Sequence, residues 1–214
     1  AQNALIPVEP TVPKQWSARW ARLLSTVFHP MLVPTQLAAL FLTSSPTGWS
    51  VLSWWSLGAV FLGTAGAPAL SAFVLHRMNL VSAFHLPLRT DRQWPLAVAA
   101  AGMYWAYKLN VRWGFPEVLT WSLLAGCATV FLVYGALLWT KASGHTAGMA
   151  AASGSIALAS LEWGWSPWPL LASVFLLSGV AAARLQLRAH TPLEIVWGLL
   201  FGALPAVALL AVRG

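Results

Sequence analysis

The stretch that decides the fold is PLEIVWGLLFGALPAVALLAV, residues Pro192 to Val212. Its one charged residue is Glu194, and Leu, Ala and Val make up most of the rest. A helix needs about 20 apolar residues to cross a hydrocarbon core ~30 Å thick, so this stretch predicts a transmembrane helix. Six further segments of similar character precede it, at roughly 30–46, 51–76, 95–111, 117–140, 145–164 and 167–183.

The composition of the whole chain favours the same fold class. Of its 214 residues, 58% are hydrophobic and only 8% are charged, and the mean hydropathy is +0.70. A soluble domain carries about a quarter charged residues, so we expect an all-α integral membrane protein. Residues 30–214 should form a single helical bundle of 6–7 transmembrane helices, some of them short enough to be tilted or partly buried.

Residues 1–29 are expected to form an N-terminal segment at the membrane interface. The sequence WSARWARLLSTVF (Trp16–Phe28) spaces its Trp, Leu and Val residues as one face of a helix, which is typical of a helix lying in the interface plane. His29, His76 and His85 lie outside the motifs discussed below, and we interpret them as interface or capping residues.

The charge and the cysteine content exclude several classes of protein. The net charge is +7, but Lys and Arg are dispersed at the ends of hydrophobic segments, without a basic run or a nucleic-acid-binding motif. Anionic lipid headgroups or anionic substrates fit this distribution better. The single cysteine, Cys127, excludes an intramolecular disulfide and a cysteine-based zinc site, and we predict that it packs in the core.

Counting the crossings places three polar clusters on one face of the membrane. They span residues 76–95, 141–145 and 183–194, and each follows an even number of predicted crossings. Three clusters on one face favour a single composite site. The excess of Lys and Arg on this face is explained by the site residues themselves, so the count does not decide which compartment the face borders.

The third cluster has the residues for phosphoryl chemistry. His190 and Glu194 are four positions apart and share one face of a helix that begins near Thr191. The carboxylate can accept the imidazole N–H and leave the other nitrogen free as a nucleophile or base, while Arg184 offers a fork of donors to phosphate oxygens. Alternatively, Thr191 and Glu194 form a capping box; both roles can coexist.

The second cluster, KASGH (Lys141–His145), precedes another predicted helix. Ser143 is a natural N-cap, and Gly144 lets a ligand approach the free N–H groups of the helix start. His145 could donate a proton to a leaving oxygen. Lys141 adds positive charge for a phosphate, although a lysine at the membrane interface is an equally ordinary interpretation.

The first cluster contributes Arg89 and Arg92, with Asp91 between them. Arginines near a membrane surface are commonly markers of topology. Beside two other clusters that suit an anion, phosphate binding by Arg89 and Arg92 becomes the alternative interpretation.

Ser-Gly-His at the head of one helix and Arg-x5-His-x3-acid before another together resemble the type 2 phosphatidic acid phosphatase superfamily, which is related to the vanadium haloperoxidases. The resemblance covers about residues 89–198. The chain departs from the family pattern at several positions: Ala142 replaces a Pro, Ala183 replaces a Ser, Glu194 replaces an Asp, and Trp94 replaces the Arg before Pro95.

The resemblance implies a role for each motif residue. His190 would be the nucleophile that forms a phosphohistidine, Glu194 would orient it, and His145 would be the general acid. No metal ion or other cofactor is implied, because cationic side chains and a helix N-terminus stabilise the transferred group. The residues expected to bind the phosphoryl oxygens are Ser143, Gly144, Arg184, Lys141, Arg89 and Arg92.

The sequence therefore predicts a metal-independent phosphatase that acts on a lipid phosphate or a polyprenyl pyrophosphate in the bacterial inner (cytoplasmic) membrane. Its expected partners are membrane lipids and the phosphorylated substrate, not nucleic acid. The departures from the family pattern motivate an alternative, a catalytically silent subunit of a membrane complex or a homo-oligomer. A small transporter is a third interpretation, with less support because no repeat is present.

Overall fold

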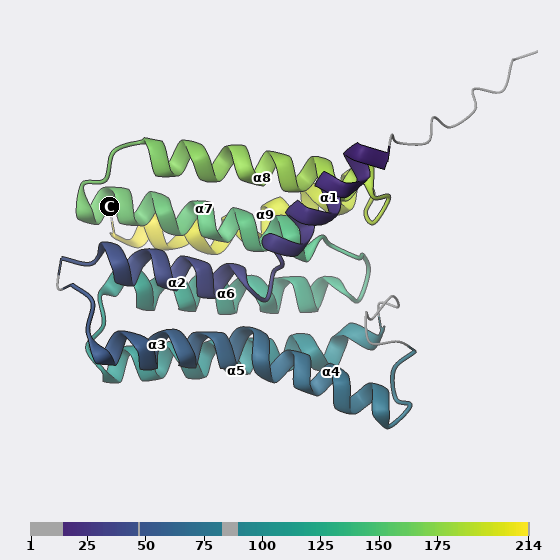
Figure 1. Cartoon of the computed structure of the whole chain (residues 1–214), viewed down its shortest axis with the longest axis horizontal. Helices are drawn as coiled ribbons and strands as arrows, with labels where there is room; N and C mark the ends of the chain where they lie inside the picture. Colours follow the sequence, from purple (N-terminus) through teal and green to yellow (C-terminus); the bar gives the residue numbers. More distant parts are fainter. Residues whose placement is uncertain (1–14, 47, 83–89, 214) are drawn as a thin grey trace, which may run out of the picture.

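The computed structural model describes residues 15–46, 48–82 and 90–213, and its regular elements over these residues are all helical (Figure 1). The helices are α1 (Gln15–Val27), α2 (Val33–Ser44), α3 (Val51–Phe61), the π-helical turn η1 (Leu62–Gly66), α4 (Ala67–Arg77), the 3-10 turn η2 (Thr90–Arg92), α5 (Gln93–Arg112), α6 (Glu117–Ala136), α7 (Gly144–Trp163), α8 (Trp168–Gln186) and α9 (Pro192–Arg213).

Four of these helices are long and apolar enough to cross a membrane. They are the continuous helix Val51–Arg77, which joins α3, η1 and α4, together with α6, α8 and α9. A helix occurs at each of the seven predicted segments, so the all-α prediction is confirmed. The predicted 6–7 crossings are not, because α2, α5 and α7 fall outside these four.

The position of α7 explains its low hydropathy. It packs against α6, α8 and α9, and more than half of its residues are buried, most of them Ala, Ser and Thr. A helix enclosed by other helices needs small side chains for close packing, whereas a helix facing lipid needs large apolar ones. The sequence GHTAGMAAASGSIALAS suits the enclosed position.

The backbones of α7 and α9 approach each other most closely through glycines. A Cβ added to Gly198 would lie 2.2 Å from Thr146 Oγ1 and 2.5 Å from the Ser143 carbonyl oxygen. A Cβ on Gly202 would lie 2.1 Å from the carbonyl oxygen of Ala147. Gly198 and Gly202 are four residues apart, so they form one narrow stripe along α9 into which α7 fits.

A second close approach holds the other half of the bundle together. In η1, a Cβ on Gly63 would lie 2.4 Å from the Gly102 carbonyl oxygen of α5. The Ser56 hydroxyl donates to the side chain of Asn110, which is fully buried and also donates to the Ala106 carbonyl oxygen over 2.8 Å. These contacts fix α3 and η1 against α5.

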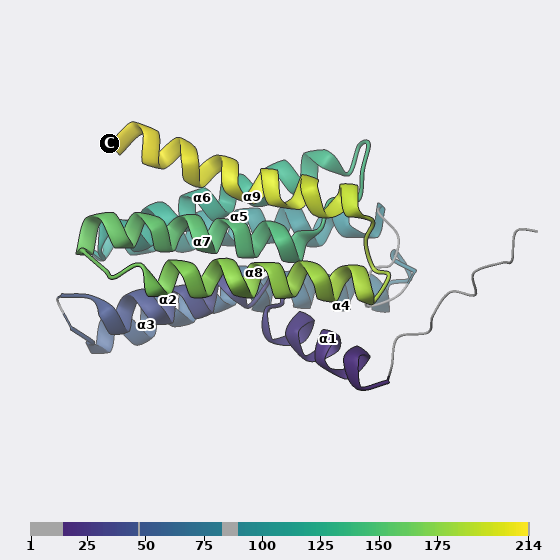
Figure 2. The same cartoon turned by 90° about the horizontal axis from the view of Figure 1, so that it is seen from above.

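The bundle has two ends, and the polar clusters gather at one of them. The turns after α4, α6 and α8 lie at the same end, on the right in Figure 1, and α1 lies there too. Figure 2 shows α1 on the outside of the bundle beside α8. Trp20, Leu23 and Val27 of α1 are exposed, while Ala21 and Ser25 are buried. The helix that the sequence predicts here is present, and its place at the membrane interface stays a prediction.

The contact between α7 and α9 gives a first prediction. Gly198→Ala forces a methyl group against backbone, and overpacking of this kind costs about 1–3 kcal/mol. We expect a lower midpoint of thermal unfolding in detergent. Gly58→Ala in α3 is the matched control: nothing lies within 4 Å of its added Cβ, so this variant should be neutral or slightly more stable. Equal effects of the two substitutions would contradict the proposed contact.

Candidate functional site

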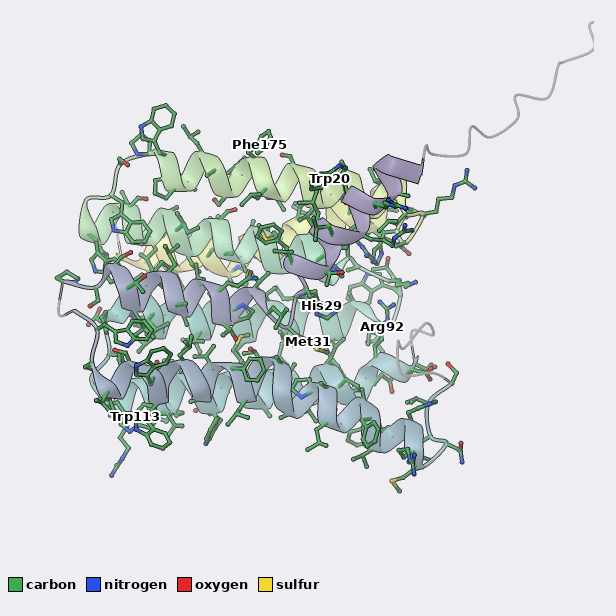
Figure 3. The ribbon with its side chains drawn as sticks, in the orientation of Figure 1. Trp20, His29, Met31, Arg92, Trp113 and Phe175 are labelled. Carbon is green, nitrogen blue, oxygen red and sulfur yellow. The ribbon has the colours of Figure 1, made fainter. Side chains whose placement is uncertain are left out.

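A cavity of about 780 Å³ opens among α1, α2, α5, α6, α7 and the C-terminal end of α8. Arg92, His145 and His190 all line it, so the three polar clusters do meet in one place. Figure 3 shows His29, Met31 and Arg92 close to one another on the side of the bundle where α1 lies. Apolar side chains of α2, α5 and α6, such as Leu37, line the rest of the cavity.

The polar part of the cavity is cationic. Three arginines and three histidines line it, and no Asp or Glu is found among its described lining residues. Arginines that share one cavity repel one another, so a wall of this composition suits an anionic ligand. The six side chains are Arg22, His29, Arg92, His145, Arg184 and His190.

His190 and Glu194 form the predicted pair. The Nδ1 atom of His190 lies 3.0 Å from Glu194 Oε2, and the His190 side chain is almost completely buried. A carboxylate accepts, so Nδ1 carries the hydrogen and the neutral ring has its free lone pair at Nε2. Burial lowers the pKa of His190, while the hydrogen bond to Glu194 raises it. The net direction is downward, which favours the neutral ring near pH 7.

Glu194 also completes the capping box. The Thr191 N–H donates to Glu194 Oε2 over 3.0 Å, and the Glu194 N–H donates to Thr191 Oγ1 over 3.3 Å. The same carboxylate oxygen therefore serves the helix cap and the histidine. The two roles, which were alternatives in the sequence, occur together.

The second cluster is attached directly to the third. The Ser143 N–H donates to the Glu194 carbonyl oxygen over 2.9 Å. The Ser143 hydroxyl accepts from the Thr146 N–H over 3.5 Å, which confirms Ser143 as the N-cap of α7. Ser143 is fully buried and lies behind Gly144, which lines the cavity. Its predicted contact with phosphate stays a prediction.

His145 makes a contact that the sequence did not predict. Its Nε2 atom lies 3.0 Å from the Ser25 carbonyl oxygen of α1, and its ring lies edge-on to the His29 ring at a centroid distance of 5.3 Å. A carbonyl oxygen only accepts, so Nε2 carries the hydrogen. The first helix is thereby fixed to the head of α7.

The remaining predicted residues differ in position. Arg184 lines the cavity, and its Nε is buried without a hydrogen-bond partner among the described residues. Arg92 lines the cavity as well. Lys141 does not line it, but the charges of Arg92 and Arg184 add to burial in lowering its pKa, so the amine is within electrostatic range. Arg89 and His85 lie outside the described residues.

The contribution of α1 to the site was not predicted from the sequence. Arg22, Ser25, Thr26 and His29 line the cavity, at the spacing i, i+3, i+4 and i+7 that defines one helical face. The apolar stripe of this segment predicted the helix, and the polar stripe beside it was the signal for the site. The turn after α1 is also stabilised by His29, whose Nδ1 accepts from the Met31 N–H over 3.3 Å.

The described residues contain no cluster of three or more His, Cys, Asp and Glu side chains placed to hold a metal ion. Cys127 is buried with Sγ 3.4 Å from the Ala100 carbonyl oxygen, so its predicted packing role is confirmed. No family model, curated protein or solved structure matches the chain.

The pair formed by His190 and Glu194 gives a second prediction. Because Glu194 raises the pKa of His190, Glu194→Gln should lower that pKa further, and the ring should protonate only at a more acidic pH than in the wild type. Histidine ring signals followed by NMR across pH 4–8 measure this. The wild-type protein, measured under the same conditions, is the reference. A His190 titration that is unchanged, or shifted to higher pH, would refute the pairing.

Proposed function

We propose that the protein is a metal-independent membrane phosphatase that acts on a lipid phosphate or a polyprenyl pyrophosphate through a phosphohistidine at His190. One observation carries the proposal. A histidine oriented by a carboxylate shares the wall of one cavity with three arginines, and most of the other lining residues are apolar. A phosphorylated amphiphile has the matching distribution of charge and hydrocarbon.

Each part of the cavity has a proposed role that follows from its chemistry. Arg92, Arg184 and the N–H groups at the head of α7 beside Gly144 would bind the phosphoryl oxygens. The hydrocarbon chain would enter the apolar part of the cavity, whose volume of about 780 Å³ is within the usual range for small-molecule sites. Desolvation of the headgroup by this enclosed wall strengthens each ionic contact.

The chemical step follows from the tautomer of His190. Its Nε2 lone pair attacks phosphorus; an N–P bond forms, and the P–O bond to the leaving group breaks with its electron pair on oxygen. Glu194 stabilises the positive charge that develops on the ring. Water then attacks the phosphohistidine, the N–P bond breaks, and phosphate is released. His145 could act as general acid only through a proton on Nδ1, since its Nε2 bonds to the Ser25 carbonyl oxygen.

The proposed setting is the bacterial inner membrane, with α5 and α7 crossing beside the four apolar helices to give six spans, the lower of the two expected numbers. Each of these two helices has 20 residues, a length of about 30 Å at 1.5 Å per residue. The less apolar faces of α5 and α7 would pack against neighbouring helices and so would not face lipid.

The nucleophile provides the third prediction. His190→Ala should abolish phosphate release from phosphatidic acid or farnesyl diphosphate, a loss of at least about 10³-fold for a covalent catalyst. Wild-type activity should persist in EDTA and be inhibited by vanadate. His76→Ala, at an exposed histidine far from the cavity lining, is the matched control and should retain full activity. Full activity in His190→Ala would refute the mechanism.

A catalytically silent subunit of a membrane complex is the second candidate. The observation that favours it is the position of two motif side chains: His145 Nε2 is held by α1, and the Ser143 hydroxyl is used as a helix cap. Such a protein would bind anionic amphiphiles in the cavity without releasing phosphate. Binding without turnover by the wild-type protein, over a panel of lipid phosphates and prenyl diphosphates, would favour this candidate.

The placement in the membrane gives the fourth prediction. Arg188→Cys and Ser166→Cys introduce exposed thiols at opposite ends of α8, and the native Cys127 is buried. A membrane-impermeant maleimide applied to intact cells should label only one of the two variants. Lys141→Cys should behave as Arg188→Cys does, because both lie at the end that holds the cavity. Equal labelling of all three would contradict a crossing by α8.

A further inference from the structure

The wall formed by α1 has a composition that the proposed chemistry at His190 does not use. Arg22, Ser25 and His29 come from α1 and the turn after it, and all three line the cavity. They are followed directly by Pro30, Met31 and other residues that continue into its apolar part. This wall therefore lies where a polar headgroup would join a hydrocarbon chain.

Two groups on this wall can donate a hydrogen bond to a ligand. Ser25 is only 7% exposed, and its hydroxyl is buried without a partner. His29 is partly buried and accepts the Met31 N–H at Nδ1, so the hydrogen of its neutral ring is on Nε2, which that hydrogen bond does not use. Buried polar groups normally have partners. A ligand with acceptor oxygens would supply them here.

Arg184 connects this wall with the nucleophile. Arg184, His29 and His190 line the same cavity, and beyond the effect of burial the charge of Arg184 lowers the pKa of both histidines. The Nε of Arg184 is itself buried without a partner. One guanidinium can donate to oxygens of two neighbouring phosphoryl groups through its fork of N–H donors.

The hydrogen bond of His145 points to the nature of the leaving group. An alkoxide needs a proton as it leaves, but the N–H of a neutral His145 is used by the Ser25 carbonyl oxygen. A phosphate monoester has a second pKa of about 6, so it leaves as a stable anion without full protonation. Cleavage between two phosphoryl groups therefore suits this site better than cleavage of a monophosphate ester.

From these contacts we infer that α1 forms a second phosphoryl subsite and that the preferred substrate is a diphosphate ester of an apolar chain. The inference rests on the proposed function and narrows its substrate class. The terminal phosphoryl group lies at His190, and the inner one lies against Arg22, Ser25 and His29. The chain continues from the inner group into the apolar part of the cavity.

The proposed reaction breaks and forms the following bonds. His190 Nε2 forms a bond to the terminal phosphorus, and the bond from that phosphorus to the bridging oxygen breaks. The electron pair stays on the bridging oxygen, which belongs to the departing monophosphate ester. The N–H of His29 and the hydroxyl of Ser25 donate to its oxygens. Water hydrolyses the phosphohistidine, so one diphosphate ester and one water give a monophosphate ester and inorganic phosphate.

The fifth prediction compares two substrates with the same chain, farnesyl diphosphate and farnesyl monophosphate, on the full-length protein in detergent. The wild type should favour the diphosphate in kcat/KM by roughly 10- to 100-fold, as expected for hydrogen bonds to a charged group. Arg22→Gln and Ser25→Ala should reduce this ratio to near one, mainly by lowering kcat/KM for the diphosphate. Ser25→Ala keeps the carbonyl that holds His145.

Arg19→Gln is the matched control, since Arg19 is an exposed arginine of the same helix that does not line the cavity. It should leave the ratio unchanged. The inference is overturned if the wild type has no preference, if Arg22→Gln reduces turnover of both substrates equally, or if Arg19→Gln has the effect of Arg22→Gln.

A binding measurement separates this inference from the proposed function. If neither substrate is turned over, the phosphatase proposal fails, and calorimetric titration with the same two farnesyl compounds still tests the subsite. Tighter binding of the diphosphate by roughly 10-fold, lost in Arg22→Gln and retained in Arg19→Gln, would support the subsite in a binding protein. Equal binding of both compounds would overturn it.

Discussion

The close approach of α7 and α9 is the constraint on which the site depends. Gly198 and Gly202 let the α9 backbone lie against the start of α7, where any Cβ would meet carbonyl oxygens. At that distance the Ser143 N–H reaches the Glu194 carbonyl oxygen. Two segments about 50 residues apart in the sequence are thereby held in a fixed relation, with Gly144 and His190 on the wall of one cavity. If α7 and α9 lay further apart, the residues at the start of each helix would form two separate helix caps and would not share a cavity wall.

This arrangement has an electrostatic cost, which the proposed binding of a phosphorylated substrate would offset. Arg92 and Arg184 line the same cavity with no Asp or Glu among its described lining residues, and burial adds to the cost of keeping them charged. The carboxylate of Glu194 is engaged by His190 and by the Thr191 N–H. Under the proposed function, a bound phosphoryl group would add negative charge to this wall and so reduce that cost.

The sequence predicts the parts of this structure that depend on local rules. The seven helical segments follow from apolar composition, and Ser143, Thr191 and Glu194 occupy the capping positions that side-chain chemistry favours. The number of membrane crossings cannot be predicted in the same way. The enclosed helix α7 has small residues where a helix facing lipid would have large apolar ones. The polar stripe of α1 was a local signal for the site, but the place where α1 packs had no such signal. Its contact with α7, from the Ser25 carbonyl oxygen to His145, joins residues 120 positions apart, and no local pattern encodes it.

Glu194 shows how one side chain can cap a helix and orient a histidine at once. A single oxygen, Oε2, lies 3.0 Å from both the Thr191 N–H nitrogen and His190 Nδ1. The reach of that oxygen depends on side-chain length, because the glutamate must turn back over the first helical turn to meet its own N-cap residue. An aspartate would place its oxygens about 1.5 Å nearer to the α9 backbone, given the length of one C–C bond. The cap and the orientation of His190 are therefore coupled. Whatever shifts the first turn of α9 also shifts His190, and the glycines that hold α9 against α7 set the geometry of both.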